Sequence, residues 1–159
     1  MKLLVILLCT LLFLPQAQAY CFNYAAAKYN QNPLVVEAIA IWESSLHPEA
    51  VGRNYDKTGR LLSSDYCLMQ VNTANVKRLI SLGVIKSSDD LLNDPCLCIQ
   101  SGTWVLARHL RICGNTWSCL GSYNAGFSHE PLQESRRQAY ASQIRAIYER
   151  LLLRQRRAG

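Results

Sequence analysis

The sequence predicts a single domain that is mainly α, in an α+β arrangement where the β part is small. Apolar residues recur at helical spacing along most of the chain after residue 20. One stretch, 51–66, is instead polar and contains glycines, which is typical of a loop or a small β-hairpin. No segment resembles a linker, a repeat or a low-complexity region. We therefore expect one domain over residues 20–159.

The first nineteen residues have the pattern of a signal peptide. Lys2 gives a short positive start, residues 3–14 are apolar, and Ala17-Gln18-Ala19 forms a cleavage signal. The apolar run is too short to span a bilayer comfortably, which makes an uncleaved anchor the weaker alternative. We expect cleavage near Ala19 and an exported, periplasmic protein.

Positive charge is concentrated toward the end of the sequence. Without Lys2, the chain has sixteen basic and eleven acidic residues, a net charge of +5. The arginines near the end either form a solvated helix face or attract an anionic polymer, a membrane surface or a partner protein. Nucleic acid is not an expected partner, because an exported chain without a nucleic-acid motif has little reason to bind it. These arginines are Arg145, Arg150, Arg154, Arg156 and Arg157.

The cysteine content indicates an oxidising compartment. Cys9 lies in the predicted signal peptide, which leaves six cysteines. An even number in an exported protein suggests disulfides, although six cysteines allow fifteen pairings. A zinc site is the alternative, but neither the cysteines nor the three histidines have the usual ligand spacing. We expect no metal and no cofactor. The six cysteines are Cys21, Cys67, Cys96, Cys98, Cys113 and Cys119.

The first half of the domain shows clear signals for the ends of its helices. A short helix is expected over residues 21–29. Asn32 and Pro33 then supply an N-cap and a first helical residue for a helix that ends before His47-Pro48. Asn72 caps a further helix that runs to residue 82 and is closed by glycine.

The second half is expected to contain two long helices. Asp94-Pro95 begins the first, which reaches Ile112 and contains Gly102, a costly residue there unless a neighbour packs closely against it. A short element follows around residues 117–123. The last helix is expected over residues 133–153, with apolar positions at Tyr140, Ile144, Ile147, Tyr148 and Leu151.

Glu43 is the candidate catalytic residue. Between residues 34 and 42 only Glu37 is charged, and helical spacing places Glu43 on the same face as Ile39. A carboxyl group on such a face loses hydration, which raises its pKa. A carboxyl that stays protonated near neutral pH can act as the general acid that cleavage of a glycosidic bond requires. The alternative is that Glu43 lies just beyond the helix end and is solvated.

Four segments, in order, resemble the motifs of the lytic transglycosylases that have a lysozyme-like fold. Residues 42–51 are similar to the family's catalytic Glu-Ser segment with its downstream Pro-x-Ala, and residues 64–72 to its Gly-Leu-Met-Gln motif. Asp94-Pro95-Cys96 is followed by glycine and leucine at familiar spacing, and residues 121–126 resemble the Ala-Tyr-Asn-Ala-Gly motif. The short chain further resembles the small specialised enzymes that accompany type III and type IV secretion, conjugation and pilus machineries.

The resemblance implies a chemistry and a set of sugar-binding residues. Protonated Glu43 would donate its proton to the β-1,4 glycosidic oxygen between N-acetylmuramic acid and N-acetylglucosamine. It would then act as base on the muramyl C6 hydroxyl, whose attack gives a 1,6-anhydro product without consuming water. Gln70, Tyr123 and Asn124 would position the sugar through hydrogen bonds, and Met69 would complete the substrate-binding site by shaping the cleft floor. The implied partners are peptidoglycan strands and components of such a machinery, and we expect a monomer.

Asp65 leaves more than one chemistry open. Residues 54–72 also resemble the hairpin of animal-type lysozymes, in which Asp65 would take the place of an aspartate. A second carboxylate there can stabilise an oxocarbenium ion or act as a nucleophile, as in a hydrolytic lysozyme. Asp65 could equally be a hairpin residue that binds its own backbone. A non-catalytic sugar-binding or assembly module is a further alternative, although the four polar residues Glu43, Gln70, Tyr123 and Asn124 argue against it.

The same resemblance implies a disulfide pairing. Cys21 and Cys96 look like the pair of the small secretion-associated enzymes. Cys67 and Cys98 replace residues that are usually glycine and asparagine in the family, and two unusual cysteines without another evident partner suggest a bond. The remaining pair, Cys113–Cys119, would close a short loop. If the replaced glycine needs a positive φ, Cys67 must be strained or its turn must differ.

Overall fold

The computed structural model describes residues 20–159, so the predicted signal peptide lies outside the described residues. The described chain is mainly helical with a small three-stranded sheet, which confirms the predicted fold class. Its elements are α1 (Phe22–Tyr29), α2 (Pro33–Ser44), β1 (Val51–Tyr55), β2 (Leu61–Tyr66), β3 (Val71–Asn72), α3 (Thr73–Ser81), α4 (Asp89–Asn93), α5 (Pro95–Cys113), α6 (Trp117–Leu120), α7 (Ser122–Ala125) and α8 (Pro131–Ala158).

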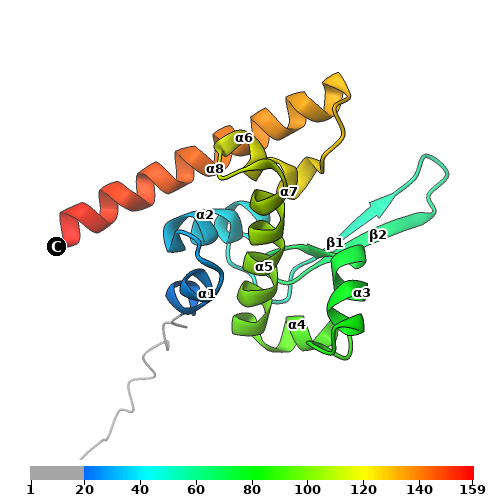
Figure 1. Ribbon diagram of the computed structural model, residues 1–159. Helices are drawn as coiled ribbons and strands as arrows, with labels where there is room; N and C mark the ends of the chain where they lie inside the picture. The colour runs from blue at the N-terminus through cyan, green and yellow to red at the C-terminus, as the bar shows by residue number, and fades with distance from the viewer. Residues whose placement is uncertain (1–19) are drawn as a thin grey trace, which may run out of the picture.

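Helix α5 runs through the middle of the molecule (Figure 1). Helices α1 and α2 lie on one side of it, whereas the sheet, α3 and α4 lie on the other. The long helix α8 crosses α2 and continues beyond it. The core where these elements meet is made of fully buried apolar side chains, among them Ile39, Leu68, Ile99, Leu106 and Ile144. Burial of this apolar surface is the main force that holds the helices together.

Side-chain caps begin the helices where the sequence indicated. Asn32 Oδ1 accepts a hydrogen bond from Leu34 N at 2.9 Å, with Pro33 as the first residue of α2. Asp94 Oδ1 accepts from Leu97 N at 3.0 Å at the start of α5. Each cap satisfies a backbone N–H group that the helix itself leaves without a partner.

Gly102 is explained by the turn that packs against α5. A Cβ atom at this position would lie 2.6 Å from Cβ of Met69, closer than real carbon atoms approach. The turn that precedes β3 therefore lies directly on the helix. A glycine inside a helix lowers the stability of that helix. The close approach of Met69 explains why glycine is present here.

The sheet is antiparallel in the order β1-β2-β3. Gly52 in β1 pairs with Asp65 in β2, and Asp65 in turn pairs with Asn72 in β3. The loop between β1 and β2 is closed by Asp56, whose Oδ1 accepts from Thr58 N at 2.8 Å and Arg60 N at 2.9 Å. The hairpin β1–β2 projects from the helical body (Figure 1).

Three disulfides link separate elements of the structure, and two of them join segments that are distant in the sequence. Cys21–Cys96 joins the start of α1 to α5, Cys67–Cys98 joins the turn before β3 to α5, and Cys113–Cys119 joins the end of α5 to α6. This is the pairing expected from the resemblance. All six cysteines of residues 20–159 are therefore bonded to one another.

The structure departs from the expected elements in three places. Helix α4 and strand β3 were not predicted, because five and two residues are too short for a periodic pattern to register. The element expected near residues 117–123 is two short helices, α6 and α7. Helix α8 extends to Ala158 rather than residue 153, since its last turns are rich in arginine and other good helix formers. Within residues 20–159, no helix is long and apolar enough to cross a membrane.

Candidate active site

Glu43 lies in the last turn of α2, inside the helix and not beyond its end. The helix terminates at Ser45, which adopts a left-handed conformation with φ 54°. Ser44 Oγ donates to the carbonyl of Leu68 at 2.9 Å and so ties the helix end to the turn before β3. The candidate acid is thereby held on a rigid helix whose end is fixed to the next functional segment.

Tyr140 is the direct partner of Glu43. Its hydroxyl group donates to Glu43 Oε1 at 2.6 Å across 97 residues of sequence, from α8 to α2. The Tyr140 side chain is buried. Sequence reasoning placed Tyr140 only in the apolar stripe of the last helix. The missed signal is chemical, because a buried tyrosine hydroxyl needs a hydrogen-bond partner and a tyrosine in an apolar stripe therefore points to one.

The surroundings of Glu43 keep its carboxyl group protonated to unusually high pH. Together these surroundings raise the pKa of Glu43 to about 7, with burial as the largest cause and the negative charge of Asp65 acting in the same direction. The hydrogen bond from Tyr140 acts in the opposite direction but is outweighed by burial. A carboxyl group with a pKa near 7 can both donate and accept a proton at neutral pH, as a general acid and base must.

Asp65, on β2, is the second carboxyl group of the site, and it lines the same cavity as Glu43. Its Oδ2 accepts a hydrogen bond from Asn54 Nδ2 at 2.7 Å. Asn54 stands on β1 and also contacts Ser63 Oγ at 3.0 Å. Asp65 is therefore held by a side chain of the neighbouring strand. Asn54, Ser63 and Asn72 line the cavity although sequence reasoning did not single them out.

The turn between β2 and β3 adopts an unusual backbone. Cys67 has φ 63° and Gln70 has φ 48°, in the left-handed region that favours glycine. Gln70 Nε2 donates to the carbonyl groups of Cys67 at 2.8 Å and Ala50 at 3.3 Å, which braces the turn from within. Cys67 thus adopts a positive φ at the position where the resemblance leads us to expect glycine, and the disulfide to Cys98 ties the turn to α5.

Met69 lies beneath the cavity and does not line it. Its side chain is fully buried against Gly102 and does not reach the cavity, so its part in substrate binding is limited to supporting the cleft floor from beneath. The physical reason is the left-handed turn, which directs this side chain into the core. Its main chain still matters, because the carbonyl of Met69 accepts a hydrogen bond from the Tyr123 hydroxyl at 2.8 Å.

Tyr123 and Asn124 complete the cavity from α7. The ring of Tyr123 stacks on Tyr140 with centroids 6.4 Å apart and planes inclined by 16°. Burial, with the nearby charges of Glu43 and Asp65, raises the pKa of Tyr123 well above its usual value, so its hydroxyl stays protonated. Asn124 is exposed at the cavity surface and its side chain is free to contact a ligand.

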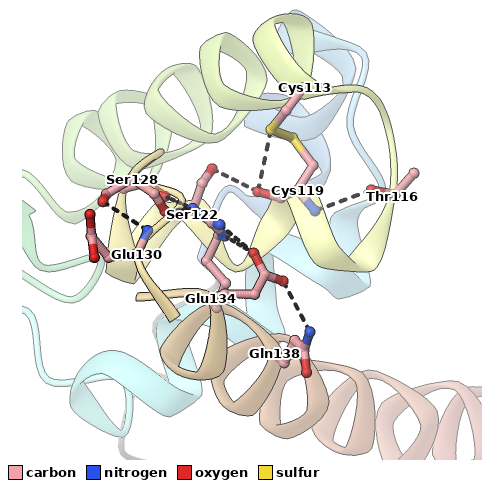
Figure 2. A network of polar contacts seen from close by, with 10 residues as sticks. Cys113, Thr116, Cys119, Ser122, Ser128, Glu130, Glu134 and Gln138 are labelled. Carbon is pink, nitrogen blue, oxygen red and sulfur yellow. Dashed lines mark hydrogen bonds and ion pairs between the residues drawn. A yellow bond between two sulfur atoms is a disulfide. The ribbon is translucent and has the colours of Figure 1, made fainter. Parts of the chain in front are cut away.

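A polar network behind α7 fixes its position (Figure 2). Ser122 Oγ donates to the carbonyl of Cys119 at 2.6 Å and lies 2.8 Å from Nδ1 of His109 on α5. The buried Arg137 donates to the carbonyl groups of Gly126 at 3.1 Å and Ser128 at 2.7 Å, and it pairs with Glu134. The loop that follows Asn124 is therefore anchored to α8.

The cavity has a volume of about 430 Å³ and a mostly polar wall. It brings together five of the six expected active-site residues, which sequence alone could not place side by side, and Met69 lies beneath it. Within residues 20–159, no group of histidine, cysteine, aspartate and glutamate side chains is arranged to hold a metal ion. The lining residues are Glu43, Asn54, Ser63, Asp65, Gln70, Asn72, Ala74, Tyr123 and Asn124.

A helical domain with a small sheet that buries one glutamic acid beside a polar, amide-lined cleft has the architecture of enzymes that cleave glycosidic bonds. Two carboxyl groups and several hydrogen-bonding amides at one cavity fit a saccharide better than an apolar ligand. The comparisons with known proteins define the class further.

The transglycosylase SLT domain model matches residues 20–147. A "Peptidoglycan-binding-like protein" of Escherichia coli O157:H7 is 42% identical over 85% of this chain and 80% of its own length. The invasion protein IagB of Salmonella typhimurium is 36% identical over 89% of this chain and 82% of its own. Among solved structures, an inactive mutant of the lytic transglycosylase Slt from Pseudomonas aeruginosa matches with a TM-score of 0.59 at 19% identity. That match covers 87% of this chain and 25% of Slt.

The chain therefore belongs to the transglycosylase SLT family and is a lytic transglycosylase. The expected lysozyme-like fold is confirmed by the structural match to Slt.

Proposed function

We propose that this protein cleaves the β-1,4 bond between N-acetylmuramic acid and N-acetylglucosamine in peptidoglycan and leaves 1,6-anhydromuramyl ends. The observation that carries the proposal is Glu43, whose burial beside an amide-lined cleft raises its pKa to about 7. Two relatives are named as peptidoglycan-binding-like proteins, which supports the same substrate.

In the proposed mechanism Glu43 acts twice. The protonated carboxyl group gives its proton to the glycosidic oxygen as the bond from that oxygen to the anomeric carbon breaks. The resulting carboxylate then takes a proton from the muramyl C6 hydroxyl, whose oxygen forms the new bond to the anomeric carbon. Glu43 ends the cycle protonated, so no water and no external base are consumed. Tyr140 holds one carboxyl oxygen of Glu43, which leaves the other to transfer the proton.

The polar side chains of the cleft have distinct proposed roles. Asn124 is exposed and would bind the sugar directly, whereas Tyr123 shapes the wall while its hydroxyl is bound to Met69 O. The Nε2 group of Gln70 donates both of its hydrogens to backbone carbonyls, so Gln70 would offer a ligand only its Oε1 oxygen. Asp65 would stabilise positive charge on the anomeric carbon as the bond breaks.

A hydrolytic lysozyme is the second candidate, and the presence of Asp65 in the same cavity favours it. In that scheme Asp65 acts as the nucleophile or stabilises the cation while water attacks. Mass spectrometry of digested peptidoglycan separates the two reactions, because anhydromuramyl ends are lighter than hydrated ends by one water. Anhydro ends support our proposal, and hydrated ends from the wild-type enzyme would replace it with the lysozyme scheme.

We further propose that residues 1–19 are a cleaved signal peptide, that the enzyme works as a monomer in the periplasm, and that it opens the wall locally for a secretion, conjugation or pilus machinery. The similarity to an invasion protein of Salmonella typhimurium supports such a role. The test is complementation of a deletion strain with the wild-type protein or with Glu43→Gln. Substrate secretion or conjugal transfer should return only with the active enzyme, and equal recovery with Glu43→Gln would exclude a role for cleavage.

A further inference from the structure

A second cavity lies at the opposite end of α2 from Glu43. It has a volume of about 330 Å³ and shares no lining residue with the active-site cleft. The turn between α1 and α2, the end of α5, helix α6 and helix α8 enclose it. Its lining residues are Asn30, Gln31, Asn32, Val35, Leu110, Asn115, Thr116, Trp117, Leu120 and Tyr148.

Two aromatic rings form one wall of this cavity. Trp117 and Tyr148 are half-buried, with ring centroids 5.6 Å apart and planes inclined by 57°. The backs of the rings pack on the core, so their positions are fixed. A rigid indole or phenol ring that faces a cavity offers an apolar surface at little entropic cost, and it suits the flat C–H face of a pyranose ring.

Four amide side chains, those of Asn30, Gln31, Asn32 and Asn115, also line the cavity, and much of their hydrogen-bonding capacity is unused. Asn32 Oδ1 caps α2 and Gln31 Nε2 donates to Tyr29 O, which leaves Asn32 Nδ2 and Gln31 Oε1. Within residues 20–159, the side chains of Asn30 and Asn115 make no hydrogen bond. These four side chains therefore present both hydrogen-bond donors and acceptors to a ligand.

No charged side chain of the described chain lines the cavity. It shares amides and a tyrosine with the active-site cleft, but its wall is more apolar and lacks the carboxyl groups of Glu43 and Asp65. A cavity of this kind selects a neutral ligand that carries hydroxyl and amide groups and has one apolar face. It has no group that could donate a proton to a glycosidic bond.

We propose that this cavity is a second saccharide site that binds the N-acetylhexosamine units of a glycan strand without cleaving them. The identity of the glycan rests on the proposed function, whereas the ligand chemistry follows from the lining side chains. Asn32 and Glu43 mark the two ends of α2, roughly 16 Å apart along the helix at 1.5 Å per residue. The enzyme would thus hold a strand at one end of this helix while it cuts at the other, and it would stay on the wall after each cleavage.

The test is a titration of the inactive variant Glu43→Gln with chitotetraose, followed by NMR. The protein has three tryptophans, so each indole N–H signal reports one location. Trp117 reports the second cavity, and the side-chain amide signals of Asn124, which lines the cleft, report the active site. We expect the Trp117 signal to shift with saturation. An unmoved Trp117 signal at millimolar sugar would overturn the proposal.

Variants separate direct binding from an effect relayed from the cleft. Asn115→Ala should weaken the affinity reported by Trp117 at least threefold and leave the Asn124 response unchanged. Asn115 is exposed and without a hydrogen bond in the described chain, so the variant is expected to fold. The matched control is Asn93→Ala, an exposed asparagine of α4 that lines neither cavity. Equal effects of the two variants would contradict direct contact.

Other ligands test the assigned chemistry. Cellotetraose has the same backbone but no acetamido groups, and we expect it to bind Trp117 more weakly than chitotetraose. A peptidoglycan stem peptide without sugar should leave Trp117 unmoved, and a Trp117 response to the peptide alone would assign the cavity to peptide instead. Binding is measured on Glu43→Gln, which is not expected to turn over, and product formation is measured on the wild-type enzyme. Absence of anhydro product would therefore contradict the proposed function, whereas absence of a Trp117 response would contradict the second site.

Discussion

At Glu43, burial and hydrogen bonding act in opposite directions on one carboxyl group. Burial raises its pKa to about 7 and Tyr140 limits that rise. Glu43→Gln keeps the shape and removes the titratable proton. Loss of general acid catalysis typically costs about 10²–10⁴-fold in rate, and we expect at least that loss on purified sacculi. Turnover at the wild-type rate would refute the assignment of Glu43.

The raised pKa of Glu43 also predicts that this carboxyl group, which activity requires, lowers the stability of the folded protein at neutral and higher pH. The folded protein holds this proton more tightly than the unfolded chain, so stability falls as pH rises from about 4.5 toward 7 and stays reduced above it. The penalty above pH 7 is about 3 kcal/mol before relaxation and solvent screening reduce it. Glu43→Gln should therefore raise the melting temperature at pH 8 and leave it little changed at pH 4. Thermal unfolding at both values checks this sign, and a lower melting temperature for Glu43→Gln at pH 8 would contradict it.

Two neighbours should move the pH profile of activity in opposite directions. The charge of Asp65 raises the pKa of Glu43 and the hydrogen bond from Tyr140 lowers it. Activity needs protonated Glu43 and so falls above its pKa. Asp65→Asn should shift this falling limb to lower pH, with partial loss of activity and anhydro ends still formed, whereas Tyr140→Phe should shift it to higher pH. Rates on sacculi from pH 5 to 9 measure the falling limb of each variant. Shifts of the same sign, or complete inactivity of Asp65→Asn, would contradict this account.

At the residue scale, sequence was most informative where a motif fixes a residue type. It identified Glu43, Asp65, Gln70, Tyr123 and Asn124, all of which line one cavity. It could not assign Tyr140 to the site, because a tyrosine in an apolar stripe gives no sign of which polar group its hydroxyl meets. It also placed Met69 in the cleft, since the backbone turn that buries this side chain is not visible in its sequence.

At the scale of elements, the turn before β3 is the segment where this chain departs from its family's usual residues. Cys67 keeps the positive φ that glycine adopts easily, and its bond to Cys98 holds the turn on α5. The helix caps at Asn32 and Asp94 were predictable because capping chemistry is local. The positions of α4 and β3 depend on tertiary packing, and no local signal in such short segments specifies them.

The double variant Cys67→Gly with Cys98→Asn, which restores the residues typical of the family, tests this turn. A disulfide of this kind stabilises by about 2–4 kcal/mol, and glycine at a positive φ regains part of that loss. We expect a lower melting temperature with most activity retained, because the hydrogen bonds of Gln70 still brace the turn. Peptide mapping of the non-reduced wild-type protein provides the complementary measurement. A free Cys67 thiol, or a Cys67–Cys96 link, would contradict the pairing.

At the scale of the whole molecule, the topology explains how distant segments make one cleft. Helix α2 supplies Glu43, β2 supplies Asp65, α7 supplies Asn124 and α8 supplies Tyr140. These residues are too far apart in the sequence for a local pattern to show that they lie together in space. Only the family resemblance could predict their proximity. The basic end of α8 lies beyond this shared core, and its last residues are exposed.

The exposed arginines at the end of α8 predict salt-dependent attachment to the anionic wall. Arg156→Gln with Arg157→Gln removes two charges and should weaken sacculus binding severalfold at low salt, while turnover of short oligosaccharides stays unchanged because the cleft is untouched. Added salt should reduce the difference, since the screening length falls from about 30 Å at 0.01 M to about 8 Å at 0.15 M. The control Lys77→Gln with Lys86→Gln removes the same charge from exposed positions elsewhere. Equal loss of binding in both variants would show that net charge, and not the end of α8, governs attachment.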